Sequence, residues 1–313
     1  MNKELAKRFY SDMYKIRRFE QEVFEFYKTG QMAGLAHLYI GEEAVAAGAC
    51  AAIEARDYIA STHRGHGHLV ARGADMGRMM AEILGKETGY SKGKGGSMHI
   101  MAMDLGILGA NGIVGGGIPM ATGAGYSSKY RGTDQVTLCF FGDGAANEGT
   151  FHESINMAAA WDLPVVYVIE NNLYGITVDS RRVTKEHDLA KRAIGYGIPG
   201  YTIDGNDVET VYKTMQKAVK HAREGKGPSI VECKTYRHHG HNGSDPGTYR
   251  PPEEVEAWKA RDPLILFRDK GYLTEKERKE IEDKVEQEVQ AACKFAAESP
   301  YPEASELMDD IFC

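Results

Sequence analysis

The sequence predicts an α/β protein: a doubly wound, mainly parallel sheet with helices on both faces, plus N-terminal and C-terminal helices. Two observations favour this class. Strand-length apolar runs alternate with helical stretches over residues 136–235, and the order strand, helix, strand recurs there. No linker and no internal repeat interrupts the 313 residues. We therefore expect a single domain over residues 1–313, with helical extensions at about 1–30 and 274–299.

The composition excludes several classes of protein. The chain is 42% apolar and 27% charged, with a net charge of −7, which is typical of a globular protein and disfavours a broad nucleic-acid-binding face. The five cysteines stand far apart, a pattern that fits reduced thiols and neither a zinc knuckle nor a disulfide framework. No apolar run approaches the length of a membrane span. The N-terminus carries acids from Glu4 onward and no apolar h-region, so it resembles no signal peptide. These features predict a cytoplasmic protein with neither nucleic-acid nor membrane partners.

The predicted elements follow in chain order. An amphipathic helix opens the chain, and the aromatic and β-branched run 136–141 is a buried strand closed by the turn 142–144. A helix over 147–162 and a strand over 163–169 complete a βαβ unit, whose two strands must be parallel. Further strands are expected at 200–205 and 228–235, joined by a helix over 208–223. The last helix begins with a capping box, Thr274 to Glu277, and its apolar stripe is expected to pack on the core: Ile281, Val285, Val289, Ala292 and Ala296.

Glycine is concentrated between residues 85 and 125. A flexible linker is the simplest interpretation, but linkers rarely carry Met98, His99, Ile113 and Val114 in the same run. We expect instead that this backbone lies close to a ligand.

Asp143 and Asn172 are the most informative residues. Each follows a predicted strand, and one helix lies between the two strands, so both should emerge at the carboxyl edge of the sheet, where α/β folds bind ligands. A carboxylate, an amide oxygen and a main-chain carbonyl near Tyr174 are hard donors suited to Mg²⁺. The amides at the start of the next helix favour phosphate. Because a carboxylate beside a diphosphate needs a cation between them, the sequence favours a metal-bridged diphosphate.

Two other sites are weighed against this one. A nicotinamide-dependent oxidoreductase would need an acid at the end of the next strand, about 20 residues on, but Asp162 falls before that strand. A histidine metal site could be built from His63, His66 and His68 or from His238, His239 and His241. The spacing disfavours it, because the first triplet lacks helical i, i+4 spacing and no HExxH motif occurs.

The motifs around these residues resemble those of the alpha subunit of the thiamine-diphosphate-dependent first component of 2-oxo acid dehydrogenase complexes, in the pyruvate and acetoin dehydrogenase branch. The resemblance runs from about residue 17 to residue 302. It is carried by HLYIGEEA (37–44), HRGHG (63–67), GKGGSMH (93–99), NGIVGG (111–116), GDGAANEG (142–149), ENNLYG (170–175), TYRHHGH (235–241) and DPGTYR (245–250).

The resemblance assigns roles to particular residues. Asp143, Asn172 and the Tyr174 carbonyl would hold Mg²⁺, and the cofactor, thiamine diphosphate, would contact His63, Arg64, Gly112, Val114, Asp143, Gly144, Ala145, Asn172 and His241. The family often has tyrosine where His63 stands, which leaves that contact open. His37 and His241 correspond to family histidines near the substrate and the diphosphate. Both would be catalytic residues, with His241 as the proton donor or acceptor. A loop over residues 240–250 looks mobile. Asn242 replaces the serine that regulated members phosphorylate.

The resemblance also implies partners. The glutamate that activates the coenzyme belongs to a beta subunit in this family, so this chain would be active only within a heterotetramer of two alpha and two beta chains. The expected reaction is decarboxylation of pyruvate, with the acetyl unit passed to a lipoyl acyltransferase. Acetoin, cleaved to acetaldehyde and a hydroxyethyl adduct, is the alternative substrate. A non-catalytic scaffold subunit is disfavoured, because a decayed site should first lose its costly buried polar groups.

Overall fold

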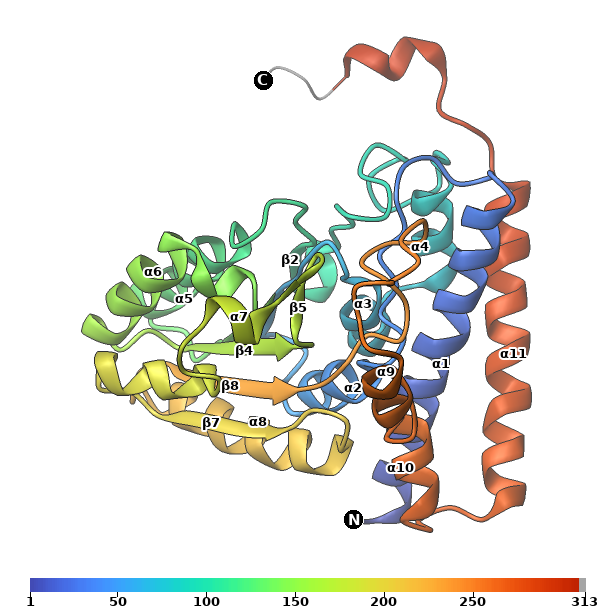
Figure 1. Cartoon of the computed structure of the whole chain (residues 1–313). Helices are drawn as coiled ribbons and strands as arrows, with labels where there is room; N and C mark the ends of the chain where they lie inside the picture. The colour runs from blue at the N-terminus through green and yellow to red at the C-terminus, as the bar shows by residue number, and fades with distance from the viewer. Residues whose placement is uncertain (310–313) are drawn as a thin grey trace.

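The structure, a computed structural model, describes residues 1–309 and is built around one parallel sheet (Figure 1). The six strands lie in the order β2-β1-β3-β4-β8-β7. A separate antiparallel pair, β5 and β6, follows β4. The strand bounds are β1 Tyr58–Ala60, β2 Ile107–Gly109, β3 Thr137–Gly142, β4 Val165–Asn171, β5 Tyr174–Gly175, β6 Val178–Asp179, β7 Gly200–Asp204 and β8 Ser229–Lys234.

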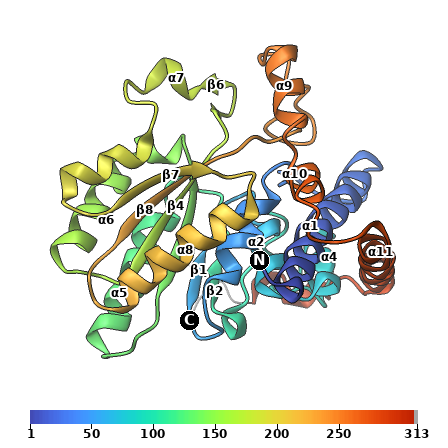
Figure 2. The same ribbon diagram turned by 90° about the horizontal axis from the view of Figure 1, so that it is seen from below.

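Helices cover both faces of the sheet because alternate side chains of its buried central strands point to opposite sides. Leu138 and Phe140 of β3 join the core shared with α2, α3 and α8, whereas Cys139 and Phe141 join the core beneath α5 and α6. Figure 2 shows α8 lying along its face of the sheet. The bounds are α2 Glu43–Ala51, α3 His66–Arg72, α5 Gly117–Tyr130, η2 Ala145–Asn147, α6 Gly149–Ala160, α7 Ser180–Val183, η3 Leu189–Tyr196 and α8 Val208–Arg223.

The two terminal helices form a third layer beside the sheet (Figure 1). The helix α1 (Lys3–Lys28) packs against α11 (Glu275–Glu298), which also contacts α4 (Met76–Ile83). Thr274 and Glu277 form the predicted capping box, and four of the five predicted stripe residues of α11 are buried, with Ile281 partly so. The remaining elements are η1 Met103–Leu105, α9 Pro252–Lys259, α10 Pro263–Asp269 and η4 Ala304–Met308.

The glycine-rich segment is organised by one acid. The carboxylate of Glu82, at the end of α4, accepts hydrogen bonds from the backbone amides of Ser91, Gly93, Gly95 and Gly96 at 2.7–3.2 Å. This segment therefore follows a specific path and is not a free linker.

The predicted α/β class is confirmed, and the predicted strands and helices between residues 136 and 235 are present. The sequence analysis missed β1 and β2, which have three residues each, and the pair β5 and β6. Cys50, Cys139, Cys233 and Cys293 are free and buried, while Cys313 lies outside the described residues. None of the helices in residues 1–309 has both the length and the apolarity needed to cross a bilayer.

Candidate active site

A cavity of about 320 Å³ opens at the carboxyl edge of the sheet. Its walls come from the segments that follow β1, β3 and β4, together with the turn at residues 111–115 of the glycine-rich segment. The chain leaves β1 toward β2 on one side, whereas β3 lies on the other side of β1. The cavity therefore sits at a topological switch point of the sheet, the usual ligand site of open α/β folds.

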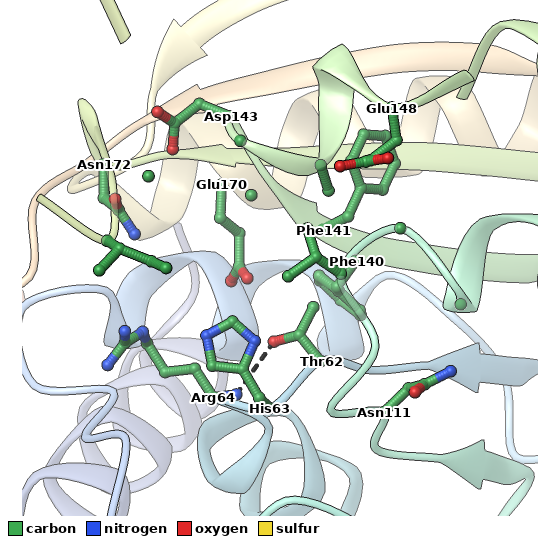
Figure 3. Close-up of a pocket in the computed structure, with 18 of the residues that line it drawn as sticks. Thr62, His63, Arg64, Asn111, Phe140, Phe141, Asp143, Glu148, Glu170 and Asn172 are labelled. Atoms are coloured by element: carbon green, nitrogen blue, oxygen red, sulfur yellow. Dashed lines mark hydrogen bonds between the residues drawn. The ribbon is translucent and has the colours of Figure 1, made fainter. Parts of the chain in front are cut away.

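Asp143 and Asn172 lie together on one wall of this cavity (Figure 3). Asp143 is 2% exposed, and its Oδ2 atom is buried with no hydrogen-bond partner among the described residues. Burial raises the pKa of Asp143 to about 6. Tyr174 also lines the cavity, and its carbonyl accepts a long bond of 3.4 Å from Arg237. These oxygens make a donor set that fits a hard divalent cation.

The turns after β3 and β4 approach each other closely. A Cβ atom placed on Gly144 would lie 3.6 Å from the Cα of Gly175, and the reverse substitution gives the same distance. Gly144 and Ala145 both line the cavity, at the start of the short helix η2. Asp143, Gly144 and Ala145 thus line the same cavity, and the role that the sequence analysis gave to the backbone amides stays a prediction.

Arg64 faces this wall from across the cavity (Figure 3). Its guanidinium donates to the carbonyls of Leu38 and His241 at 2.8 and 2.9 Å, and its Nε lies 3.7 Å from Glu42 Oε2. Glu42 also accepts a bond of 3.0 Å from the side-chain amide of Asn172. One buried carboxylate therefore connects the predicted metal side of the cavity with the predicted diphosphate-binding arginine.

Glu42 and Glu170 were not assigned a role by the sequence analysis. Both line the cavity and are buried. Burial, followed by repulsion from Glu170, raises the pKa of Glu42 to about 8. Glu170 accepts hydrogen bonds from Tyr39 and, at 2.9 Å, from His68. No sequence signal marked them, because their burial, which is rare for a glutamate without a partner, is visible only in the structure.

Three histidine rings meet at the rim. His37, His63 and His241 have ring centroids 4.8–5.5 Å apart. His63 and His241 line the cavity, and His37 lies behind them, nearly fully buried. Neither histidine triplet weighed from the sequence forms a metal cluster among the described residues. In the first, His66 is bonded to Glu20 and His68 to Ser61 and Glu170. In the second, His238 lies beside Asp262 and His239 against the ring of Phe24.

The loop over residues 240–250 carries His241 and is held by Asp245. This carboxylate accepts from the backbone amides of His241 and Gly247 at 2.5 and 2.8 Å, and from the Tyr249 hydroxyl at 2.8 Å. Gly243 adds a backbone bond of 2.9 Å to Ala36. The loop is irregular, as predicted, and the mobility expected of it stays a prediction.

The structure brings most of the predicted site residues to this one cavity. Its lining includes His63, Arg64, Val114, Asp143, Gly144, Ala145, Asn172, Tyr174 and His241. Gly112 lies between two lining residues, Asn111 and Ile113, without itself being one of them. Asp162, the acid needed by the nicotinamide alternative, lies between α6 and the amino end of β4, away from the carboxyl edge.

The fold and the cavity define an α/β enzyme whose site lies at the carboxyl edge of a parallel sheet. The chain belongs to the family of dehydrogenase E1 components, whose family description matches residues 11–305. It is therefore a member of an oxidoreductase family.

Three relatives illustrate the match. The chain is 47% identical over 317 residues to the alpha subunit of acetoin:2,6-dichlorophenolindophenol oxidoreductase of Bacillus subtilis, covering 100% of this chain and 95% of the relative. It is 42% identical to the pyruvate dehydrogenase E1 component subunit alpha of Rickettsia felis, over 97% of this chain and 94% of that one. For the Rhizobium meliloti subunit of the same name, the identity is 43%, with coverages of 99% and 90%.

Proposed function

We propose that this chain is the alpha subunit of a thiamine-diphosphate-dependent pyruvate dehydrogenase. The observation that carries the proposal is the buried, unpaired Oδ2 of Asp143, a residue that lines the same cavity as Asn172 and Gly144. An unpaired buried carboxylate is costly unless a cation compensates it. A coenzyme diphosphate bridged to the protein by Mg²⁺ would supply that cation.

The proposed contacts follow the cavity walls. Asp143, Asn172 and the Tyr174 carbonyl would hold Mg²⁺. The amides of Gly144 and Ala145, with Arg64 and His63, would hold the diphosphate. Gly112 and Val114 would lie along the aminopyrimidine. When bound, thiamine diphosphate supplies a nucleophilic carbon and an electron sink for decarboxylation. The protein positions the substrate, excludes water and moves protons.

His241 and His37 are the proposed proton-transfer residues of this chain. Burial lowers the pKa of His241 to about 4 and that of His37 to about 3, with Arg64 as the next cause for each. Both rings are therefore neutral near pH 7. Arg64 fixes the backbone of His241 through its carbonyl, which supports a defined position for that ring.

The proposal includes partners that this chain does not contain. A beta subunit would supply the glutamate for the aminopyrimidine, in an assembly of two alpha and two beta chains. A lipoyl acyltransferase would accept the acetyl unit, in the cytoplasm. Ile113 and Val114, on the cavity wall, are 72% and 51% exposed, and such apolar exposure beside a site is typical of a surface that a partner covers.

Acetoin is the second candidate substrate, and the 47% identity to the Bacillus subtilis acetoin-oxidising subunit favours it. The deciding experiment reconstitutes the chain with its beta subunit and measures turnover of pyruvate, acetoin and a branched 2-oxo acid. Turnover of pyruvate above the other two supports the proposal. Turnover of acetoin alone would show that acetoin, and not pyruvate, is the substrate. Binding of NAD in equilibrium dialysis, without binding of thiamine diphosphate and Mg²⁺, would overturn the whole assignment. Inactivity on every substrate, despite coenzyme binding, would favour the scaffold interpretation.

A further inference from the structure

The histidines at the cavity rim form a cluster with the composition of a transition-metal site. His37, His63 and His241 each offer one ring nitrogen, and these three nitrogens lie within 4.8 Å of one another. They come from three separate segments: the one before α2, the one after β1 and the loop at residues 240–250. The fold, and not a local sequence motif, brings them together.

One ring of the cluster carries a nitrogen with unmet bonding capacity. Nδ1 of His37 is buried, and no donor or acceptor pairs with it among residues 1–309. The His37 residue is 4% exposed, so bulk water does not supply the missing partner. A buried polar atom without a partner is rare in folded proteins and calls for a ligand or an ordered water.

The three rings are in the protonation state that metal binding requires. Burial, followed by the charge of Arg64, lowers the pKa of His63 to about 2. The same two causes, in the same order, lower the pKa values of His37 and His241. All three imidazoles are therefore neutral at pH 7, and a cation does not have to displace protons from them.

Arg64 holds the three segments together. It follows His63 directly, donates to the carbonyl of Leu38, the residue after His37, and donates to the carbonyl of His241 itself. Its positive charge repels a cation at the cluster, and Glu42, 3.7 Å from Arg64 Nε, offsets part of that charge. The cluster is thus preorganised by its backbone before any ion binds.

We propose that His37, His63 and His241 form a binding site for a divalent transition metal of the Zn²⁺ class. Three imidazole nitrogens would coordinate the ion, and the fourth position would face the cavity. Zn–N bonds of about 2.0–2.1 Å place tetrahedral ligand atoms roughly 3.4 Å apart, so small rotations of the rings complete the geometry. This nitrogen site is distinct from the oxygen site at Asp143. It uses rings that the proposed function assigns to the coenzyme and to proton transfer, so an ion bound there would compete with both roles.

Cobalt distinguishes the two sites, because Co²⁺ bound by three imidazoles in a tetrahedral site absorbs visible light far more strongly than Co²⁺ in an octahedral oxygen site. The full chain, freed of metal with EDTA and held in excess Mg²⁺ without thiamine diphosphate, is titrated with Co²⁺. We expect one equivalent to give the intense tetrahedral band, and Zn²⁺ to abolish that band by displacement.

The variants His37→Phe and His63→Phe should each lose the band, while His187→Asn, which changes an exposed histidine, should keep it. Far-UV circular dichroism checks folding, and His63→Tyr, the residue common in the family, serves if a phenylalanine variant does not fold. A weak octahedral spectrum alone would overturn the proposal. An intense band that survives both cluster substitutions would overturn it as well.

Discussion

The side-chain amide of Asn172 donates a hydrogen bond of 3.0 Å to Glu42 Oε1, which joins the end of β4 to the segment before α2. This bond directs the amide nitrogen toward Glu42 and leaves the amide oxygen on the side of Asp143 (Figure 3). Glu42 is not itself a predicted ligand of the cation. Through this bond it sets the orientation of Asn172, which is one.

Replacing Glu42 with alanine should weaken Mg²⁺-dependent binding of thiamine diphosphate about 10- to 100-fold, the usual cost of losing a group that orients a metal ligand. Without Glu42, Asn172 loses the acceptor that fixes its amide. Calorimetric titration of the reconstituted enzyme with the coenzyme, at fixed Mg²⁺, measures the change. Glu42→Gln keeps an acceptor oxygen and should restore most of the affinity; equal losses in both variants would contradict an orienting role.

The Asp143→Asn substitution should separate stability from binding. The pKa of Asp143 rises from 3.8 to about 6 on folding, so the folded chain keeps a proton that the unfolded chain has lost. This group therefore lowers stability as pH rises from about 4 to 6, by up to roughly 3 kcal/mol. At pH 8 the variant without ligands should resist urea better than the parent chain, with a difference that disappears near pH 4.

The same variant should bind thiamine diphosphate and Mg²⁺ much more weakly, because an amide does not neutralise the cation. Asp269→Asn, at the exposed end of α10, is the matched control and should change neither property. Unchanged coenzyme affinity in Asp143→Asn would remove this residue from the metal site.

Removing the Glu82 carboxylate should loosen the glycine-rich segment. Four backbone amides lose their acceptor in Glu82→Ala, at a cost on the order of 2–3 kcal/mol. Trypsin should then cut at the exposed Lys92 and Lys94 many times faster than in the parent chain. Glu87→Gln, an exposed acid five residues on, should leave the rate unchanged. Equal rates in parent and Glu82→Ala chains would show that other contacts hold the segment.

Asp245 should control the position of His241. Asp245→Ala removes the acceptor of the His241 amide, the Gly247 amide and the Tyr249 hydroxyl. We expect turnover of the reconstituted enzyme to fall about 10-fold, since small displacements of a proton-transfer group are costly. Ser244→Ala, on the exposed side of the same loop, should retain normal turnover. Full activity in Asp245→Ala would mean that the loop keeps its conformation without the hydrogen bonds to Asp245.

Much of the fold was predictable because its central strands are buried on both faces. The run at 136–141 is continuously apolar, as a strand covered by helices must be, and β3 lies there within one residue at each end. β1 and β2 escaped prediction because three residues carry no periodicity. Asp143 and Asn172 were found because a crossover of one helix and one strand places both at the same sheet edge.

The partners of the predicted site residues could not be predicted in the same way. Glu42 meets Asn172 across 130 positions of sequence, and His37 meets His241 across a still longer separation. Such pairs depend on how α2 and the loop at 240–250 pack on the sheet, which no local pattern encodes. The organisation as one domain also stays a prediction.

The thiols of Cys139 and Cys233 lie in neighbouring regions of the sheet but in different cores, beneath α5 and α6 for Cys139 and beneath α8 for Cys233. Burial raises the pKa of both thiols, so neither reacts with an alkylating reagent while its helical cover is in place. The alkylation rate of each thiol consequently reports how often the helices above it open. Peptide-resolved alkylation rates would tell which helical layer opens first, without any label being introduced.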